Sequence, residues 1–143
     1  MRALPSEAQT STTAPDAARE RARWLEIFAA RLFGTLSADL AAQIPAERRA
    51  RVAAEALEFF SLRTEPIKVR IVLEPRGGGA GGFAETVMED CPFIIDSTLE
   101  YFHHLGIGAG ILMHPVLSAE RDGGGRLVSL EDQRAAEKSD VFR

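Results

Sequence analysis

The spacing of apolar residues changes near residue 63, and this change constrains the fold of the chain more than any other feature. Before that point, apolar side chains recur every three or four positions, as at Trp24, Phe28 and Leu32, which is typical of a helix with one buried side. From Ile67 to Leu73, apolar and mostly polar residues alternate, which is typical of a β-strand with one buried face. The sequence therefore predicts helices first and mixed α and β structure afterwards.

Residues 16–62 are predicted to form three helices, which are separated at Gly34 and at Pro45. Ser37 is placed to cap the short second helix, because its hydroxyl can accept a hydrogen bond from a free main-chain N–H. Proline is tolerated in the first turn of a helix, so Pro45 fits the start of the third. Residues 1–15 are rich in Ser, Thr, Ala and Pro, and this composition predicts a disordered tail.

Residues 63–143 are predicted to follow a β-β-α-β-β order. The expected elements, in chain order, are a strand from Glu65 onward, a flexible connection over Arg76–Gly82, a strand over Phe83–Met88, a helix over Asp90–Leu105, a strand over Gly110–Ala119, a turn over Asp122–Gly125, a strand over Arg126–Leu130 and a polar link over Glu131–Lys138. This order predicts an α+β fold in which helices pack on one face of a mainly antiparallel sheet. A further strand begins at Asp140 and stays incomplete, which predicts a domain truncated at its C-terminus.

The predicted helix after Met88 has recognisable start and stop residues. Asp90 is expected to act as the N-cap, and Pro92 is tolerated in the first turn. Gly106 is expected to end the helix, where a left-handed conformation is required. The apolar side chains expected on its buried side are those of Phe93, Ile94, Leu99, Phe102 and Leu105.

Charge and composition exclude several classes of function. Residues 1–62 carry 8 basic and 8 acidic side chains and residues 63–143 carry 9 and 13, so the net charge of −4 lies in the second part. An acidic surface argues against binding to a nucleic-acid backbone. Cys91 is the only cysteine, and the chain has no apolar leader and no run of about 20 apolar residues. We therefore expect a cytoplasmic protein without a disulfide or membrane span.

The polar motifs do not match known catalytic or metal-binding patterns. The glycine-rich segments Gly77–Gly82 and Gly123–Gly125 are not followed by the Gly-Lys-Ser/Thr step of a phosphate-binding loop. His103 and His104 are adjacent on the predicted helix, so their side chains point about 100° apart and cannot share one metal ion in the usual manner. Ser97 lacks the Gly-x-Ser-x-Gly elbow of a nucleophilic serine. A small stand-alone enzyme that uses Asp96, Ser97 and His104 is the alternative from a different class.

Several motifs in the second part of the chain occur in a familiar order. They are Met88–Thr98, His104–Ile107, His114–Leu117, Arg121-Asp122 and Gly125. Together they resemble the first ACT-like domain of the large bacterial NAD-specific glutamate dehydrogenases, with matching order and spacing over about residues 64–130.

The resemblance implies a non-catalytic role within a larger enzyme. The parent enzyme would oxidise glutamate to 2-oxoglutarate and ammonia with NAD, using catalytic and cofactor-binding residues outside this chain. Residues 63–143 would form an incomplete ACT-like domain, preceded by the helical segment. The ACT-like region would serve regulation and oligomer assembly, through self-association and contacts with other domains of the same enzyme.

An amino-acid effector is the ligand that the resemblance implies, and a stand-alone ACT-like sensor is the alternative function. ACT domains that hold amino acids usually have a glycine after the proline at the strand-to-helix turn, where this chain has Phe93. The aromatic ring would fill the core or an interface. The residues expected to form an effector site or interface at this turn are Asp90, Cys91, Pro92, Phe93, Asp96 and Ser97.

Overall fold

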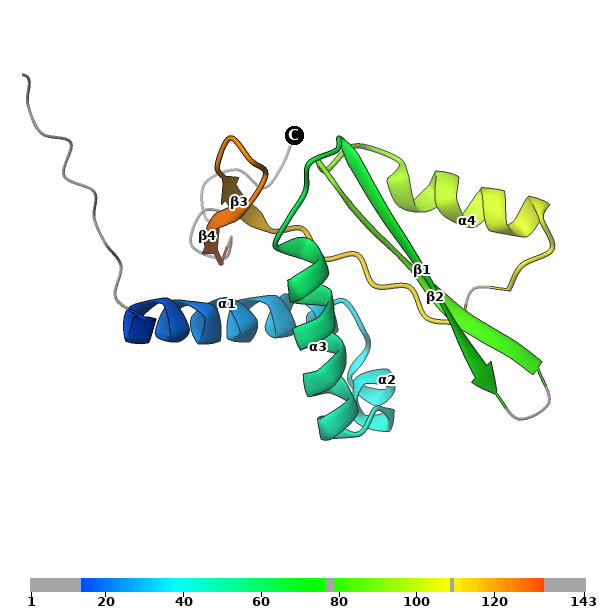
Figure 1. Ribbon diagram of the computed structural model, residues 1–143. Helices are drawn as coiled ribbons and strands as arrows, with labels where there is room; N and C mark the ends of the chain where they lie inside the picture. Colours follow the sequence, from blue (N-terminus) through cyan, green and yellow to red (C-terminus); the bar gives the residue numbers. More distant parts are fainter. Residues whose placement is uncertain (1–13, 77–78, 109, 133–143) are drawn as a thin grey trace, which may run out of the picture.

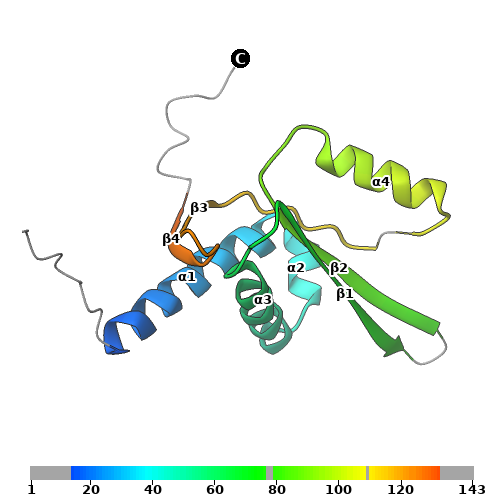
Figure 2. The same ribbon diagram turned by 45° about the horizontal axis from the view of Figure 1, so that its top comes forward.

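The computed structural model describes residues 14–76, 79–108 and 110–132 (Figure 1). The elements are α1 (Ala14–Gly34), α2 (Ala38–Gln43), α3 (Ala46–Phe60), β1 (Ile67–Arg76), β2 (Gly79–Met88), α4 (Ile94–His104), β3 (Ser118–Arg121) and β4 (Leu127–Glu131). The predicted α+β class and the order of its elements are confirmed. In both ribbon views, the β1–β2 hairpin and α4 extend to one side of the group formed by α1, α3, β3 and β4 (Figures 1 and 2).

The buried core lies where α1 and α3 meet the β3–β4 ribbon. Phe28 and Leu32 of α1 pack with Leu57 of α3 and with Leu127 and Leu130 of β4. Leu57 and Leu130 are each 1% exposed, so they are the side chains that leave water most completely. Burying an aliphatic side chain of this size contributes about 1.5–3 kcal/mol. The helical segment and the C-terminal ribbon therefore share one core.

The three predicted helices are confirmed, with small shifts at their ends. The side chain of Ser37 accepts a hydrogen bond from the N–H of Leu40, as expected of a cap. Pro45 lies at the N-cap of α3, one residue before the helix begins. The prediction of a disordered tail over residues 1–15 falls mainly outside the described residues, but its last two residues already belong to α1.

Among the described residues, the buried and half-buried side chains of α1 all lie in its C-terminal half. Residues 14–23 are all exposed, and Trp24 is the first half-buried side chain along the helix. The N-terminal half of α1 consequently projects away from α3 (Figure 1).

The β1–β2 hairpin is longer than predicted. Its strands pair antiparallel from Ile67 opposite Met88 to Arg76 opposite Gly79, so the expected flexible connection over Arg76–Gly82 is wrong in extent. Gly82 belongs to β2, where an added Cβ would lie 2.3 Å from the carbonyl oxygen of Val72. Glycine therefore allows close approach of the two backbones here.

The hairpin packs against α3 through the face of β1 that the sequence predicted to be exposed. Side chains of cross-strand partners lie on the same face, so Lys68 shares one face with Val87, and Arg70 shares it with Glu85. This mixed face packs against the end of α3, because Lys68 and Arg70 both lie over the ring of Phe59. We call it the inner face.

The alternating aliphatic residues of β1 lie on the opposite, outer face. These residues, with their exposed fractions, are Ile67 (55%), Val69 (56%), Ile71 (70%) and Leu73 (78%). The prediction that the alternating pattern would bury its aliphatic side is wrong for the described residues. The physical reason is that the cations of the inner face bind the end of α3, which fixes the orientation of the strand.

The four strands form two separate two-stranded sheets. The third strand was expected over Gly110–Ala119, but β3 begins only at Ser118. Pro115 has no N–H to donate to a ladder, and the residues before β3 carry no strand pairing. β4 begins one residue later than predicted and ends one residue later. Residues 110–117 therefore do not extend β3 toward the hairpin.

The β3–β4 turn is built around Asp122, as the sequence predicts. Its carboxylate accepts hydrogen bonds from the N–H groups of Gly124 and Arg126, each at 2.9 Å. Gly125 adopts φ +79° and lies against Arg63, whose N–H donates to the Gly125 carbonyl at 2.9 Å. The turn therefore also anchors the linker between α3 and β1. The expected link over Glu131–Lys138 falls mainly, and the incomplete strand from Asp140 entirely, outside the described residues.

Replacing Gly125 by alanine is expected to lower the free energy of unfolding by about 2–4 kcal/mol. The new Cβ would lie 2.1 Å from the carbonyl oxygen of Arg63, in a left-handed conformation that disfavours a side chain. Gly123→Ala is the matched control, because its Cβ would meet nothing within 4 Å. Urea unfolding of the two variants measures the difference. Equal stability of both variants would contradict the tight contact at Gly125.

Candidate functional site

The C-terminal end of α3 binds a cluster of cations, which we call the α3 junction. Lys68 Nζ donates hydrogen bonds to the carbonyl oxygens of Phe59 and Leu62, at 2.6 and 2.7 Å. Arg121 Nη2 donates to the carbonyl oxygen of Phe60 at 2.7 Å. Positive charge is favourable at this end of a helix, because the last carbonyl groups are free and the helix dipole is negative there.

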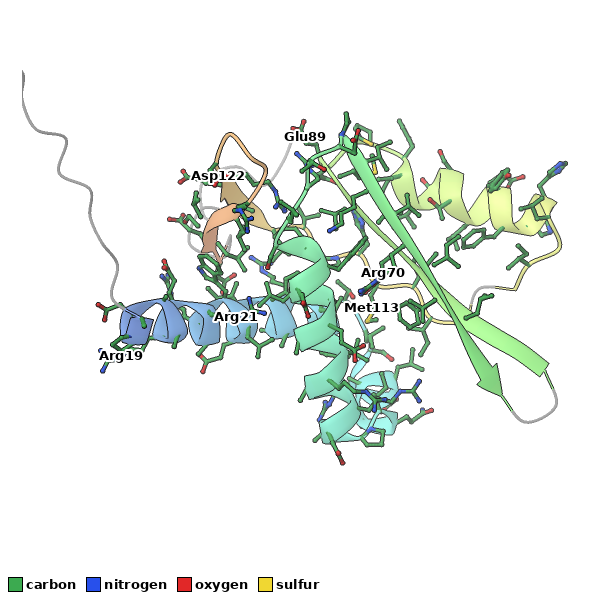
Figure 3. All side chains as sticks on the ribbon, in the orientation of Figure 1. Arg19, Arg21, Arg70, Glu89, Met113 and Asp122 are labelled. Carbon is green, nitrogen blue, oxygen red and sulfur yellow. The ribbon has the colours of Figure 1, made fainter. Side chains whose placement is uncertain are left out.

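The cations of the α3 junction also stack on aromatic rings. Lys68 Nζ lies 4.2 Å from the ring centre of Phe59, and Arg121 Cζ lies 4.7 Å from that of Phe60. Arg70 completes the group from the inner face, where its Nε donates to Glu85 at 2.6 Å. Figure 3 shows Arg70 in the space between α3 and the hairpin. The junction thus joins α3 to the hairpin and to β3.

Burial and neighbouring positive charges lower the pKa values of two cations at the α3 junction. Burial lowers the pKa of Lys68, and the nearby charges of Arg70 and Arg121 lower it further. Burial likewise lowers the pKa of Arg121, with a smaller effect from Arg63. Hydrogen bonds to carbonyl oxygens and contacts with aromatic rings offset the repulsion between these cations. The cations therefore stabilise the contact of α3 with the hairpin and with β3.

The turn between β2 and α4, which the sequence identified as the candidate site, is held by two acidic residues. Glu89 Oε1 lies 3.5 Å from Arg63 Nη2, at the end of the hairpin that Figure 3 shows nearest α3. Asp90 Oδ1 lies 3.6 Å from His114 Nε2, which makes an ion pair when the imidazole is protonated. These contacts place the turn beside the linker after α3 and the segment before β3.

Phe93, and not Asp90, occupies the N-cap of α4. Phe93 has φ 65° and ψ 11°, and its side chain makes no capping hydrogen bond. The prediction that Asp90 caps the helix is therefore wrong, because Asp90 turns to His114 and lies four residues before the first helical residue, Ile94. The ring of Phe93 is 76% exposed, so it does not fill the core of the described structure.

α4 keeps most of its apolar side chains accessible. None of its residues is buried, and of the five residues predicted on its buried side only Ile94 and Phe102 are half-buried. The predicted burial of Phe93, Leu99 and Leu105 is thus wrong within the described chain. Gly106 does end the helix in the left-handed conformation, with φ 69°, as the sequence predicts.

Four of the six predicted site residues line a shallow, open hollow. Cys91, Pro92, Phe93 and Ser97 line it, together with residues farther along α4. Asp90 and Asp96 are not part of its lining. Cys91 is exposed and free. The structure therefore brings four of the six predicted residues together, on a surface open to solvent.

The residues of the alternative enzyme do not form a catalytic relay in the described structure. Ser97 and His104 line a second open hollow on α4, and Asp96 does not contribute to it. Among residues 14–76, 79–108 and 110–132, no hydrogen bond joins the Ser97 hydroxyl to a histidine. The same ranges contain no cluster of three side chains able to hold a metal ion.

Sequence reasoning missed the roles of Lys68 and Arg121. The alternation of Lys68 with apolar residues suggested a solvent-facing position, and no structural role was predicted for Arg121. Both long side chains instead reach carbonyl groups near the end of α3. The signal that pointed to one of them was the Arg121-Asp122 pair followed by Gly125, which belongs to the quoted motif. Arg121 contacts the end of α3, Gly125 contacts the linker after it, and Asp122 holds the turn that contains Gly125.

The comparison with protein families decides how this arrangement is classified. The family model described as glutamate dehydrogenase, ACT1 domain, matches residues 28–142. The chain belongs to this family. Neither a curated protein nor a solved structure gave a match.

As an ACT1 domain, the chain is a regulatory module of a glutamate dehydrogenase. The match begins within α1 and includes α3, so the α3 junction lies inside the ACT1 region. Across the described ranges, each helix is too short or too polar to cross a lipid bilayer.

Replacing Phe93 by glycine is expected to stabilise the ACT1 domain by about 0.5–1 kcal/mol, because glycine adopts the left-handed conformation without the steric cost of a side chain. Phe93→Ala is the control, since it removes the exposed ring and retains the cost. Thermal unfolding followed by circular dichroism compares the two variants. If alanine stabilised the domain as much as glycine, the effect would come from the ring and not from the backbone.

Replacing Arg121 by methionine is expected to cost about 1.5–3 kcal/mol of unfolding free energy, because charge-assisted hydrogen bonds to the carbonyl groups of Phe60 and Gly125 are lost. Arg126→Met is the matched control, because Arg126 is exposed on the same ribbon. Chemical denaturation of both variants tests this. If Arg126→Met lowered the unfolding free energy as much as Arg121→Met, the hydrogen bonds of Arg121 at the α3 junction would not be the cause of the loss.

Proposed function

We propose that this ACT1 domain regulates and helps to assemble an NAD-dependent glutamate dehydrogenase. The parent enzyme would oxidatively deaminate L-glutamate to 2-oxoglutarate and ammonia, with NAD as the electron acceptor. The observation that carries the proposal is the family match over residues 28–142, which spans most of the described chain.

The use of its charged side chains supports an architectural role for the domain. Lys68 and Arg121 donate to main-chain carbonyl groups, and Arg70 pairs with Glu85. These cations are engaged in joining elements, whereas large apolar side chains of the hairpin and α4 are exposed. A surface of that kind suits contact with other protein surfaces, as an assembly module requires. The free thiol of Cys91 is compatible with a cytoplasmic location, which is part of the proposal.

The proposal is tested by placing an affinity tag on this segment in its native gene and purifying the polypeptide that carries it. We expect that polypeptide to be larger than the 15.6 kDa of the chain and to form NADH from NAD only when glutamate is added. The 143-residue chain purified alone is the control and should form none. A tagged native polypeptide without glutamate-dependent NAD reduction would refute the proposal.

A further inference from the structure

The β1–β2 hairpin packs its mixed, charged face against α3 and leaves its aliphatic face exposed. Its inner face, which carries Lys68, Arg70 and Glu85 beside Val72 and Val87, packs on α3. The aliphatic side chains of Ile67, Val69, Ile71 and Leu73 lie on the opposite face and are exposed. A lone domain would normally bury the aliphatic face of a half-buried strand. The hydrogen bonds from Lys68 to the end of α3 fix the opposite orientation, so the aliphatic face is left for another surface.

Exposure of large apolar side chains is concentrated in the part of the chain that contains this hairpin. Within the described ranges, all such residues except Leu40, Leu62 and Val128 lie between Ile67 and Leu112. By contrast, Val87 is the only buried hydrophobic residue in that interval among those described. An exposed apolar region of this kind marks a site of protein–protein contact.

We propose that the outer face of the hairpin packs against the outer face of a second copy of this chain. The inference deepens the assembly role in the proposed function, on which it rests, by naming the surface that is used. The contact residues on β1 are Ile67, Val69, Ile71 and Leu73, and those beside them on β2 are Ala84 and Thr86.

The charge distribution favours a second copy as the occupant. In a two-fold symmetric contact each patch meets itself, so any charge on the patch would face its like near the axis. The six named residues of the outer face carry no charge, whereas Lys68, Arg70 and Glu85 all lie on the inner face. The outer face is therefore self-complementary in charge as well as in hydrophobicity.

The size of the outer face determines how strong this dimer should be. Four aliphatic side chains that are each more than half exposed offer several hundred Å² per partner, which is below the roughly 800 Å² per partner of a standard stable interface. The contact belongs to the small, reversible class. We therefore expect a dimer whose population rises with protein concentration.

The test is sedimentation velocity of the 143-residue chain from low micromolar to submillimolar concentration. The wild-type chain should shift reversibly from monomer to dimer. Ile71→Glu places a carboxylate near its symmetry mate and should weaken dimerisation at least about tenfold. Val128→Glu is the matched control, because Val128 is exposed on β4, away from the hairpin, and this variant should dimerise like the wild type.

The outcomes separate this inference from the proposed function. Circular dichroism and thermal unfolding establish that both variants are folded, which is expected because Ile71 is 70% and Val128 48% exposed. A wild-type chain that stays monomeric at every concentration would overturn the inference, without affecting the glutamate-dependent activity of the tagged native polypeptide. A dimer equally tight in Ile71→Glu would also overturn it, and would assign self-association to another surface such as a strand edge.

Discussion

The end of α3 is the contact on which the other parts of the structure depend. Its last carbonyl groups lack partners within the helix, and they accept hydrogen bonds from Lys68 of the hairpin and from Arg121 of β3. The residues that follow the helix add a second tie, because Ser61 accepts from the N–H of Leu127. One helix terminus thus sets the positions of two sheets that do not pair with each other.

The same contact explains why the molecule has a core on one side and an apolar surface on the other. Around Leu57 and Leu130, apolar side chains from α1, α3 and β4 pack together. On the hairpin, the groups that reach α3 are cations with long stems, which can cover an aromatic ring while their charges find oxygen atoms. Ile67, Val69, Ile71 and Leu73 of β1 consequently lie on the outer face and are exposed. The hairpin therefore buries less of its apolar surface than the core of α1, α3 and β4 does.

The sequence was informative wherever structure depends on neighbouring residues. The cap at Ser37, the turn at Asp122 and the left-handed end at Gly106 were all predicted, because each needs only a few adjacent residues. Failures occurred where a distant partner decides. Alternation identified β1 as a strand but could not say which face would be covered, since that depends on α3. Asp90 has the chemistry of a cap, yet the helix begins only at Ile94 and the Asp90 carboxylate lies 3.6 Å from His114, which is distant in the sequence.

The uneven attachment of α1 has a consequence for motion. Its C-terminal half is fixed by Phe28 and Leu32, whereas residues 14–23 are all exposed in the part of the chain that the structure describes. A short helical stretch without tertiary packing is only marginally stable in water, so the amide hydrogens of these first turns should exchange with deuterium orders of magnitude faster than those near Leu32. We therefore expect α1 to be rigid near Leu32 and to fray toward its N-terminal end.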